Sequence, residues 1–261
     1  MNVYILTDME GISMVFLKEQ CQGGHAFYPR YQEILTAEVN AAVEGAIAAG
    51  ATRIVVNDGH GGNQDYNILC EKLNPIVEIE RPDSGKLVLP ALDDSFHAMI
   101  MVGYHSMAGT PNSVIPHTQN STTILTYWIN GRPIGEIEQM SLLAGQFGVP
   151  VMYVSGDRAA IDEARQVLGE DLPATVIKQG HPNGRTTSIH PQEAVKRIRA
   201  DVEAALKQPR RAPHHVEGPY DMRITYKCIE SANNHAARAD ITRYDDFTVG
   251  RTVTEVNDIL L

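Results

Sequence analysis

Cysteine and long apolar segments are scarce in this sequence. No uninterrupted apolar run approaches the roughly 20 residues of a membrane-spanning helix. The N-terminal residues lack the basic start and apolar stretch of a secretory signal. The three cysteines are odd in number and far apart, so they predict neither a disulfide framework nor a metal-binding cysteine pair. Together these absences predict a cytoplasmic protein with reduced thiols and no membrane contact.

Basic residues are outnumbered by acidic ones. The 261 residues include 22 lysines and arginines against 32 aspartates and glutamates, which gives a formal charge of −10. Sequence-independent binding to nucleic acid needs a basic face, so we expect no nucleic-acid partner. Hydrophobic residues make up 43% and charged residues 21%, as in ordinary globular proteins, and the length allows one large or two small domains.

The N-terminal half alternates apolar strand patterns with a helical pattern. Residues 3–6, 53–57 and 97–102 are predicted as strands because they are short and apolar. Residues 31–49 have a helical period, and the glycine that follows them is a typical helix end. This alternation predicts an α/β fold, with a layered, mostly parallel sheet flanked by helices.

The rest of the chain predicts a smaller, mixed α+β portion. Asn130-Gly131, directly after the β-rich segment 122–129, is a strong hairpin signal. We place a domain boundary near residue 150, with an α/β metal-binding domain at 1–150 and a second portion at 151–261. The further predicted elements are strands at 149–154, 174–178 and 221–227 and helices at 136–147, 158–168, 191–207 and 252–261.

Potential metal ligands follow three of the predicted strands. Asp8 and Glu10 come after the first, where a spacing of two would place them on one face of a continuing strand. His60 follows the second strand and His105 the third. Ligands bind outside the carboxyl ends of strands in open α/β sheets, and two carboxylates with two imidazoles suit Zn²⁺. Each residue alone has an ordinary explanation as a cap, turn or core residue, but their coincidence favours a metal site.

Three further residues have two interpretations at this level. Asp58 precedes a glycine and is either a turn residue or a support for His60. His117 lies in a loop 12 residues after His105, where it is either an acid, base or orienting group or an exposed loop histidine. Glu136 opens a predicted helix, where the helix dipole explains an acidic residue without any role in chemistry.

Five short motifs occur in order along residues 1–160. They are Asp8-Met9-Glu10-Gly11-Ile12-Ser13, Val56-Asn57-Asp58-Gly59-His60, Gly103-Tyr104-His105, Pro116-His117 and Arg132-Pro133-Ile134-Gly135-Glu136. With these motifs the chain resembles the zinc-dependent D-aminopeptidase family, closely over this segment and loosely beyond it. One position departs from the family pattern SxDxEG, since Leu6 stands where the pattern has serine.

The resemblance implies a two-zinc centre and a catalytic histidine. His117 matches the catalytic histidine of the family. The family also forms ring-like homo-oligomers, decameric in its prototype, and residues 151–261 would then contribute to the contacts between subunits. The metal ligands that the resemblance implies are Asp8, as the bridge between the ions, Glu10, His60, His105 and Glu136.

The predicted activity is that of a metal-dependent aminopeptidase. Such an enzyme removes the N-terminal residue, of D or L configuration, from short peptides or amino-acid amides, with a metal-activated water as the attacking group. One alternative is a two-metal phosphoesterase, although no phosphate loop or basic cluster accompanies the motifs. The other is a non-catalytic assembly protein with a structural metal, although structural zinc sites are usually rich in cysteine.

Overall fold

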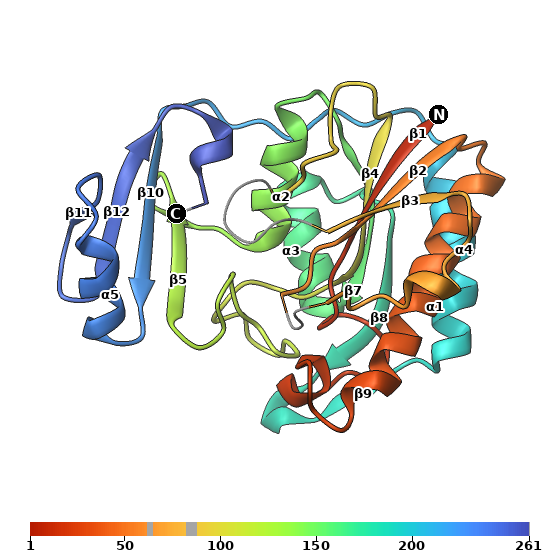
Figure 1. The fold of residues 1–261 in the computed structure, drawn as a ribbon, viewed down its shortest axis with the longest axis horizontal. Coiled ribbons are helices and arrows are strands. Elements are labelled where there is room, and N and C mark those ends of the chain that lie inside the picture. Colours follow the sequence, from red (N-terminus) through yellow and green to blue (C-terminus); the bar gives the residue numbers. More distant parts are fainter. Residues whose placement is uncertain (62–64, 82–87, 261) are drawn as a thin grey trace.

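The strands of the molecule form two separate sheets (Figure 1). The computed structural model describes residues 1–61, 65–81 and 88–260, and within them a large sheet has seven strands and a small sheet has five. The strand orders are β3-β2-β1-β4-β7-β8-β9 and β11-β12-β10-β5-β6. Neighbours in the large sheet are parallel except β8 and β9, and neighbours in the small sheet are antiparallel. The predicted α/β fold with a mostly parallel sheet is therefore confirmed.

The large sheet is covered by helices on both faces (Figure 1). Strand β1, an inner strand of this sheet, sends Val3 and Ile5 into the core beneath α1 and α4, and Tyr4 and Leu6 into the core beneath α2 and α3. This alternation follows from the two-residue period of a strand, and it explains why the strand is apolar throughout. The strands are Asn2–Thr7 (β1), Arg53–Asp58 (β2), Val77–Glu80 (β3), Ala98–Tyr104 (β4), Val151–Asp157 (β7), Ala174–Gly180 (β8) and Thr186–Ser188 (β9). The helices are Tyr28–Ala48 (α1), Glu136–Gly145 (α2), Arg158–Leu168 (α3) and Pro191–Leu206 (α4).

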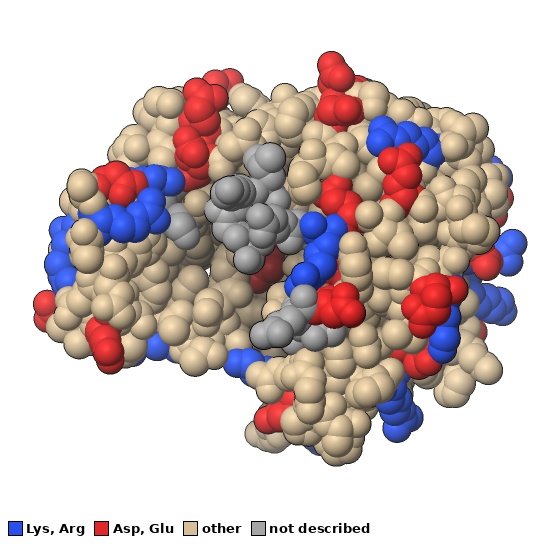
Figure 2. Space-filling view, in the orientation of Figure 1, with Lys and Arg blue, Asp and Glu red and all other residues tan. Residues whose placement is uncertain are grey.

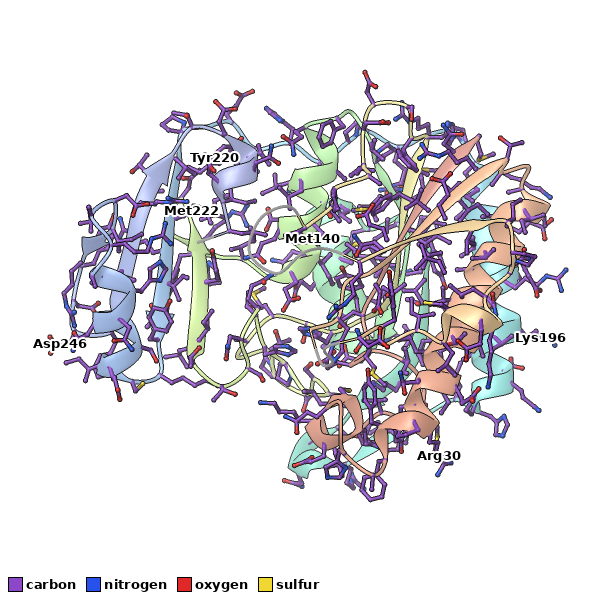
Figure 3. All side chains as sticks on the ribbon, in the orientation of Figure 1. Arg30, Met140, Lys196, Tyr220, Met222 and Asp246 are labelled. Atoms are coloured by element: carbon purple, nitrogen blue, oxygen red, sulfur yellow. The ribbon has the colours of Figure 1, made fainter. Side chains whose placement is uncertain are left out.

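The small sheet packs on the far side of α2. Met140 of this helix lies in the middle of the molecule, between the two sheets (Figure 3). Asn130 and Gly131 both have positive φ, 50° and 79°, and close the predicted hairpin between β5 and β6. The elements are Ile124–Ile129 (β5), Arg132–Pro133 (β6), Tyr220–Tyr226 (β10), Ile229–Ala236 (α5), Thr242–Arg243 (β11) and Thr248–Val253 (β12). Four 3-10 turns complete the described chain: Lys18–Cys21 (η1), Cys70–Lys72 (η2), Pro182–Gly184 (η3) and Val256–Asp258 (η4).

The structure differs from the sequence-based expectation at the C-terminus. The predicted helix at 252–261 is wrong, because β12 extends to Val253 and only η4 follows it, while Leu261 lies outside the described residues. The domain boundary near residue 150 stays a prediction. Strands from both sides of it pair with each other, β7 with β4 and β5 with β10. Strand pairing brings together segments that are distant in sequence, and local periodicity does not report it.

Candidate metal centre

The predicted ligands gather at the carboxyl edge of the large sheet. Here β1 lies between β2 and β4. The strands that follow β1 in sequence are added first on one side of it, as β2 and β3, and then on the other side, from β4 onward. Such a reversal of strand order is where open α/β sheets form a ligand-binding crevice. Three neighbouring strands deliver candidate ligands into it, with Asp8 and Glu10 after β1, His60 after β2 and His105 after β4.

Two close backbone contacts position the turn after β1. The Asp8 amide donates to the Val102 carbonyl over 2.8 Å, and the Gly11 amide donates to the Gly103 carbonyl over 2.7 Å. A Cβ on Gly11 would overlap the Tyr104 carbonyl oxygen, and one on Gly103, whose φ is +78°, would overlap the Asp8 carbonyl oxygen. We expected Asp8 and Glu10 to share one face of a continuing strand, and this prediction is wrong. Strand β1 ends at Thr7, and a turn packed against β4 directs both carboxylates.

Asp8 is shared between two imidazoles. Its Oδ1 lies 3.0 Å from His60 Nδ1, and its Oδ2 lies 3.2 Å from His105 Nε2. Glu10 Oε2 lies 3.0 Å from the same nitrogen of His60. Glu136, at the start of α2, places Oε1 3.5 Å from His105 Nε2. The centre thus has two halves that meet at one carboxylate.

Backbone carbonyls orient each imidazole of the centre. In every case one ring nitrogen bonds a main-chain oxygen, and this leaves the other nitrogen directed at the carboxylates as a ligand or base. The three contacts are His60 Nε2 to the Cys21 carbonyl at 2.9 Å, His105 Nδ1 to the Ser106 carbonyl at 3.0 Å and His117 Nδ1 to the Ile115 carbonyl at 3.1 Å.

His117 reaches the centre from the loop before β5. Its ring stacks on His105 with centroids 3.9 Å apart and planes at 11°, and its Nε2 lies 3.9 Å from Glu10 Oε1. It is therefore not an exposed loop residue, but the geometry admits it as a base or as a ligand. Candidate ligand atoms form two groups, each within 4.8 Å: Asp8, Glu10 and His60 in one, and His105, His117 and Glu136 in the other.

Unpartnered carboxylate oxygens make this centre suited to a cation. Asp8 is 7% exposed and Glu10 is 5% exposed. Among the described residues, Asp8 Oδ2 and Glu10 Oε2 are buried and accept no hydrogen bond, although an imidazole nitrogen lies 3.2 Å from the first and 3.0 Å from the second. Burying a carboxylate oxygen in this way is costly unless a cation lies beside it. Carboxylate oxygens and imidazole nitrogens in this number are a donor set that fits Zn²⁺.

The protonation of the centre reflects the same crowding. Burial, reinforced by the charge of Glu10, raises the pKa of Asp8 to about 6. Burial alone would lower the pKa of His105, but the carboxylates of Glu136 and Asp8 raise it to about 9. The His60 pKa is raised well above its usual range by the same kind of carboxylate neighbours, against burial. A metal ion must therefore displace protons from these imidazoles, which makes metal binding dependent on pH.

Asp58 supports the loop that carries His60. Its carboxylate is 2% exposed and accepts hydrogen bonds from the Asn67 amide at 2.5 Å and the Asn67 side chain at 2.9 Å. Asn67 Nδ2 also donates to the His60 carbonyl over 2.6 Å. Asp58 thus acts on the main chain of this loop rather than on the imidazole. Gly62, in the same glycine-rich segment, lies outside the described residues.

A buried lysine that the sequence analysis missed holds the turn after β1. Lys178 of β8 is 2% exposed, and burial lowers its pKa to about 8. Across the turn, Glu38 of α1 is fully buried and accepts from the amide and hydroxyl of Ser13. The one available signal was a single charge at the end of an otherwise uncharged predicted strand, 174–178. Lys178 Nζ donates to three backbone carbonyls of the turn, those of Glu10, Ile12 and Val15.

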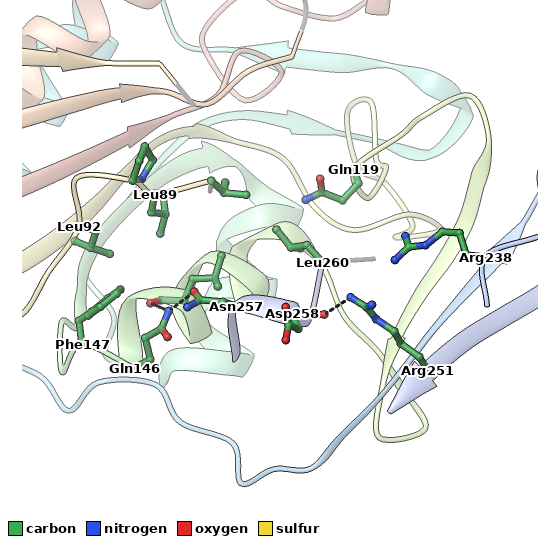
Figure 4. A pocket seen from close by; sticks show the side chains of 13 residues that line it. Leu89, Leu92, Gln119, Gln146, Phe147, Arg238, Arg251, Asn257, Asp258 and Leu260 are labelled. Carbon is green, nitrogen blue, oxygen red and sulfur yellow. Dashed lines mark hydrogen bonds between the residues drawn. The ribbon is translucent and has the colours of Figure 1, made fainter. Parts of the chain in front are cut away.

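The centre opens into a cleft of about 430 Å³. Leu6, at the position where the family pattern has serine, contributes an apolar part of its wall. Figure 2, drawn in the orientation of Figure 1, shows a hollow near the middle of the molecule with acidic atoms inside it. A second cavity of about 600 Å³ shares Gln119 and Val88 with the cleft and has Arg238 and Arg251 on its far side (Figure 4).

The centre combines buried carboxylates that suit a cation with an oriented imidazole, and it opens into a cleft at the edge of the sheet. This arrangement is typical of a metal-dependent hydrolase. Comparison with known proteins agrees with this class. A family model described as D-aminopeptidase matches residues 1–260. The chain belongs to the D-aminopeptidase family.

Two relatives from one bacterium are similar to this chain. A D-aminopeptidase of Bacillus subtilis (strain 168) is 30% identical over 208 residues, which are 79% of this chain and 74% of the relative. The solved structure of the Zn-dependent D-aminopeptidase DppA from Bacillus subtilis, described as a self-compartmentalizing protease, has a TM-score of 0.92 and 25% identity, and the match covers 99% of this chain and 94% of that one. The predicted family and the predicted class, a metal-dependent aminopeptidase, are confirmed. Among the described residues, no helix is both long and apolar enough to cross a membrane.

Proposed function

We propose that this chain is a two-zinc aminopeptidase that removes a D-configured N-terminal residue from short peptides and amino-acid amides. The observation that carries the proposal is the position of Asp8, whose two carboxylate oxygens face the two imidazoles separately. A bridging carboxylate of this kind is what a pair of metal ions needs. The names of both relatives support D-configured substrates, and the name of the solved relative also supports zinc.

In this proposal the two halves of the centre hold one ion each. Asp8 would be shared by both ions, Glu10 and His60 would hold one of them, and His105 and Glu136 would hold the other. Bound zinc would supply Lewis acidity that polarises the scissile carbonyl and activates water.

His117 is the proposed catalytic residue. Its Nδ1 is occupied by the Ile115 carbonyl, so Nε2 is the nitrogen that accepts and returns a proton during hydrolysis. The stacked ring of His105 holds the imidazole of His117 in place. These groups line the same cleft of about 430 Å³, in which a short peptide would bind.

A panel of paired D- and L-amino-acid amides, with added Zn²⁺, Mn²⁺ or Co²⁺, tests the proposal. We expect hydrolysis of the D-series, loss of activity on chelation and recovery on readdition of zinc, with two ions per chain by elemental analysis. Equal activity of the chelated and zinc-loaded protein would contradict a metal mechanism. Release of phosphate from an aryl phosphate, without amide hydrolysis, would replace it with phosphoesterase activity.

We further propose a ring-like homo-oligomer, with ten subunits as the expected number, assembled through the small sheet. The solved relative is described as self-compartmentalizing. Leu125 and Phe247 are 50% and 44% exposed and line one shallow depression on this sheet, and exposed apolar patches mark interaction surfaces. Changing both residues to aspartate should yield smaller species in sedimentation, whereas Ile76→Asp, an equally exposed position beside β3, should not.

The compartment that we propose is the cytoplasm. The three cysteines are free, with Cys21 buried and Cys228 exposed. Unpaired thiols of this kind persist where the surroundings are reducing. Fractionation of the native host with an antibody against the chain tests this assignment, and recovery outside the cytoplasm would contradict it.

A further inference from the structure

We propose that Lys18 binds the free C-terminal carboxylate of a short peptide substrate. The inference rests on the proposed aminopeptidase function and adds to it a preference for peptides over amides. It follows from the position of the lysine in the cleft, from the contact that holds its ammonium group and from its lack of an acidic partner.

Lys18 belongs to η1 and faces the same cleft as the metal centre. The described wall of this cleft includes Asp8, Glu10 and Glu136, and Lys18 is the one lysine or arginine in it. The side chain is half-buried, and it comes from the segment that follows the turn after β1. The cleft therefore has carboxylates where metal ions would bind and a single ammonium group elsewhere on its wall.

The ammonium group is held in place by the opposite wall. Lys18 Nζ donates to Thr122 Oγ1 over 3.1 Å. Thr122 is fixed in turn, because Asn120 Oδ1 accepts from the amides of Thr122 at 2.9 Å and Thr123 at 3.0 Å. An ammonium group has three donors, so two are left for a ligand. A cation oriented before the ligand arrives loses less side-chain entropy on binding.

Lys18 has no acidic partner among the described residues. Some other lysines do, for example Lys72 with Glu33 and Lys207 with Glu203. The ion pairs of the described chain do not include Lys18, although acidic residues are in excess over the whole sequence. A half-buried cation with spare donors in a substrate cleft favours an anionic ligand.

A dipeptide substrate supplies one anionic group close to the reacting bond. When the N-terminal residue of a dipeptide occupies the metal centre, its C-terminal carboxylate lies on the leaving-group side, one residue away. A cleft of about 430 Å³ is of the size that binds such small molecules. Amino-acid amides and peptide amides lack this carboxylate, so the contact with Lys18 separates the two substrate classes.

The test compares D-alanyl-glycine with D-alanyl-glycinamide on the zinc-loaded full-length protein. We expect Lys18→Met to raise KM for the free dipeptide by about tenfold, the effect of losing one charge-assisted hydrogen bond, and to change KM for the amide by less than about twofold. Lys18→Arg should retain most of the preference. The matched control is Lys227→Met, because Lys227 Nζ donates to the Ser121 carbonyl in the same loop but does not line the cleft.

The outcomes separate this inference from the function on which it rests. If the wild-type protein cleaves both substrates and Lys18→Met leaves their KM ratio unchanged, the assignment of Lys18 is wrong and the aminopeptidase function stands. Equal losses on both substrates also overturn it, since they indicate a general effect on the cleft. If the wild-type protein cleaves neither substrate with zinc, the proposed function fails and the inference fails with it.

Discussion

Charged side chains have different environments in the two sheets. At the edge of the large sheet they are buried: Asp8 is 7% exposed and Lys178 is 2% exposed. In the small sheet they lie at the surface and pair with one another. These surface pairs are Arg223 with Asp221, Arg238 with Asp240 and Arg251 with Asp240.

This difference in burial indicates which charged side chains serve the chemistry of the protein. A buried charge without full compensation costs several kcal/mol, so a fold retains one only where it serves a purpose. Exposed ion pairs contribute about 0–1 kcal/mol and are replaceable. We therefore expect substitutions at the edge of the large sheet to alter chemistry and metal binding, and substitutions of the small-sheet pairs to alter little.

The largest effect is expected for His117→Ala. Removing the proposed base should lower kcat by about 10²–10⁴-fold, the usual range for general acid–base catalysis. The zinc content should remain at two ions per chain if His117 is a base. A drop to one ion would instead identify it as a ligand of the half that contains His105 and Glu136.

The next effect is expected for Lys178→Met. Three carbonyls of the turn after β1 would lose their donor, so we expect about 3 kcal/mol less unfolding free energy and roughly 10–100-fold weaker zinc binding. Competition with a chromophoric chelator measures the affinity, and the visible spectrum of the Co²⁺-loaded protein reports the ligand geometry. Lys207→Met, at an exposed lysine, serves as control. An unchanged zinc affinity would show that Lys178 stabilises the fold alone.

A smaller effect, with a defined pH dependence, is expected for Glu163→Gln. Glu163 is 5% exposed, and burial raises its pKa from 4.5 to about 7. Between pH 4.5 and 7 the native state keeps a proton that the unfolded state has released, so stability falls as pH rises and the penalty is complete above pH 7. The variant should gain about 2 kcal/mol at pH 8 and little at pH 4.5 in urea unfolding. An equal gain at both pH values would point to packing, and Glu170→Gln, at an exposed position, should show no gain.

The smallest effect is expected for Arg223→Met in the small sheet. Its pair with Asp221 is partly exposed, so the change in unfolding free energy should stay within about 1 kcal/mol and shrink further with added salt. Activity on amino-acid amides should be unchanged. A loss comparable to that of Lys178→Met would remove the distinction between the two sheets.

Sequence periodicity was sufficient for the central strands and for the first ligands. Strands β1 and β4 end directly before Asp8 and His105, and β2 ends two residues before His60. Parallel neighbours deliver such residues to one edge of the sheet. The small sheet was harder to predict, because β11 has only two residues, β12 is partly polar and α5 spans only Ile229–Ala236. Weak local patterns of this kind are stabilised by pairing rather than by propensity.

By itself the sequence determined the α/β alternation, the acidic character and four of the residues that meet at the sheet edge. Only the tertiary structure decided what approaches that edge from elsewhere. His117 arrives on a loop, Glu136 on the first turn of α2, and Lys178 from a strand 168 residues beyond Glu10. The physical reason is that helix and strand periods report local burial, whereas the position of a distant side chain depends on how whole elements pack against one another.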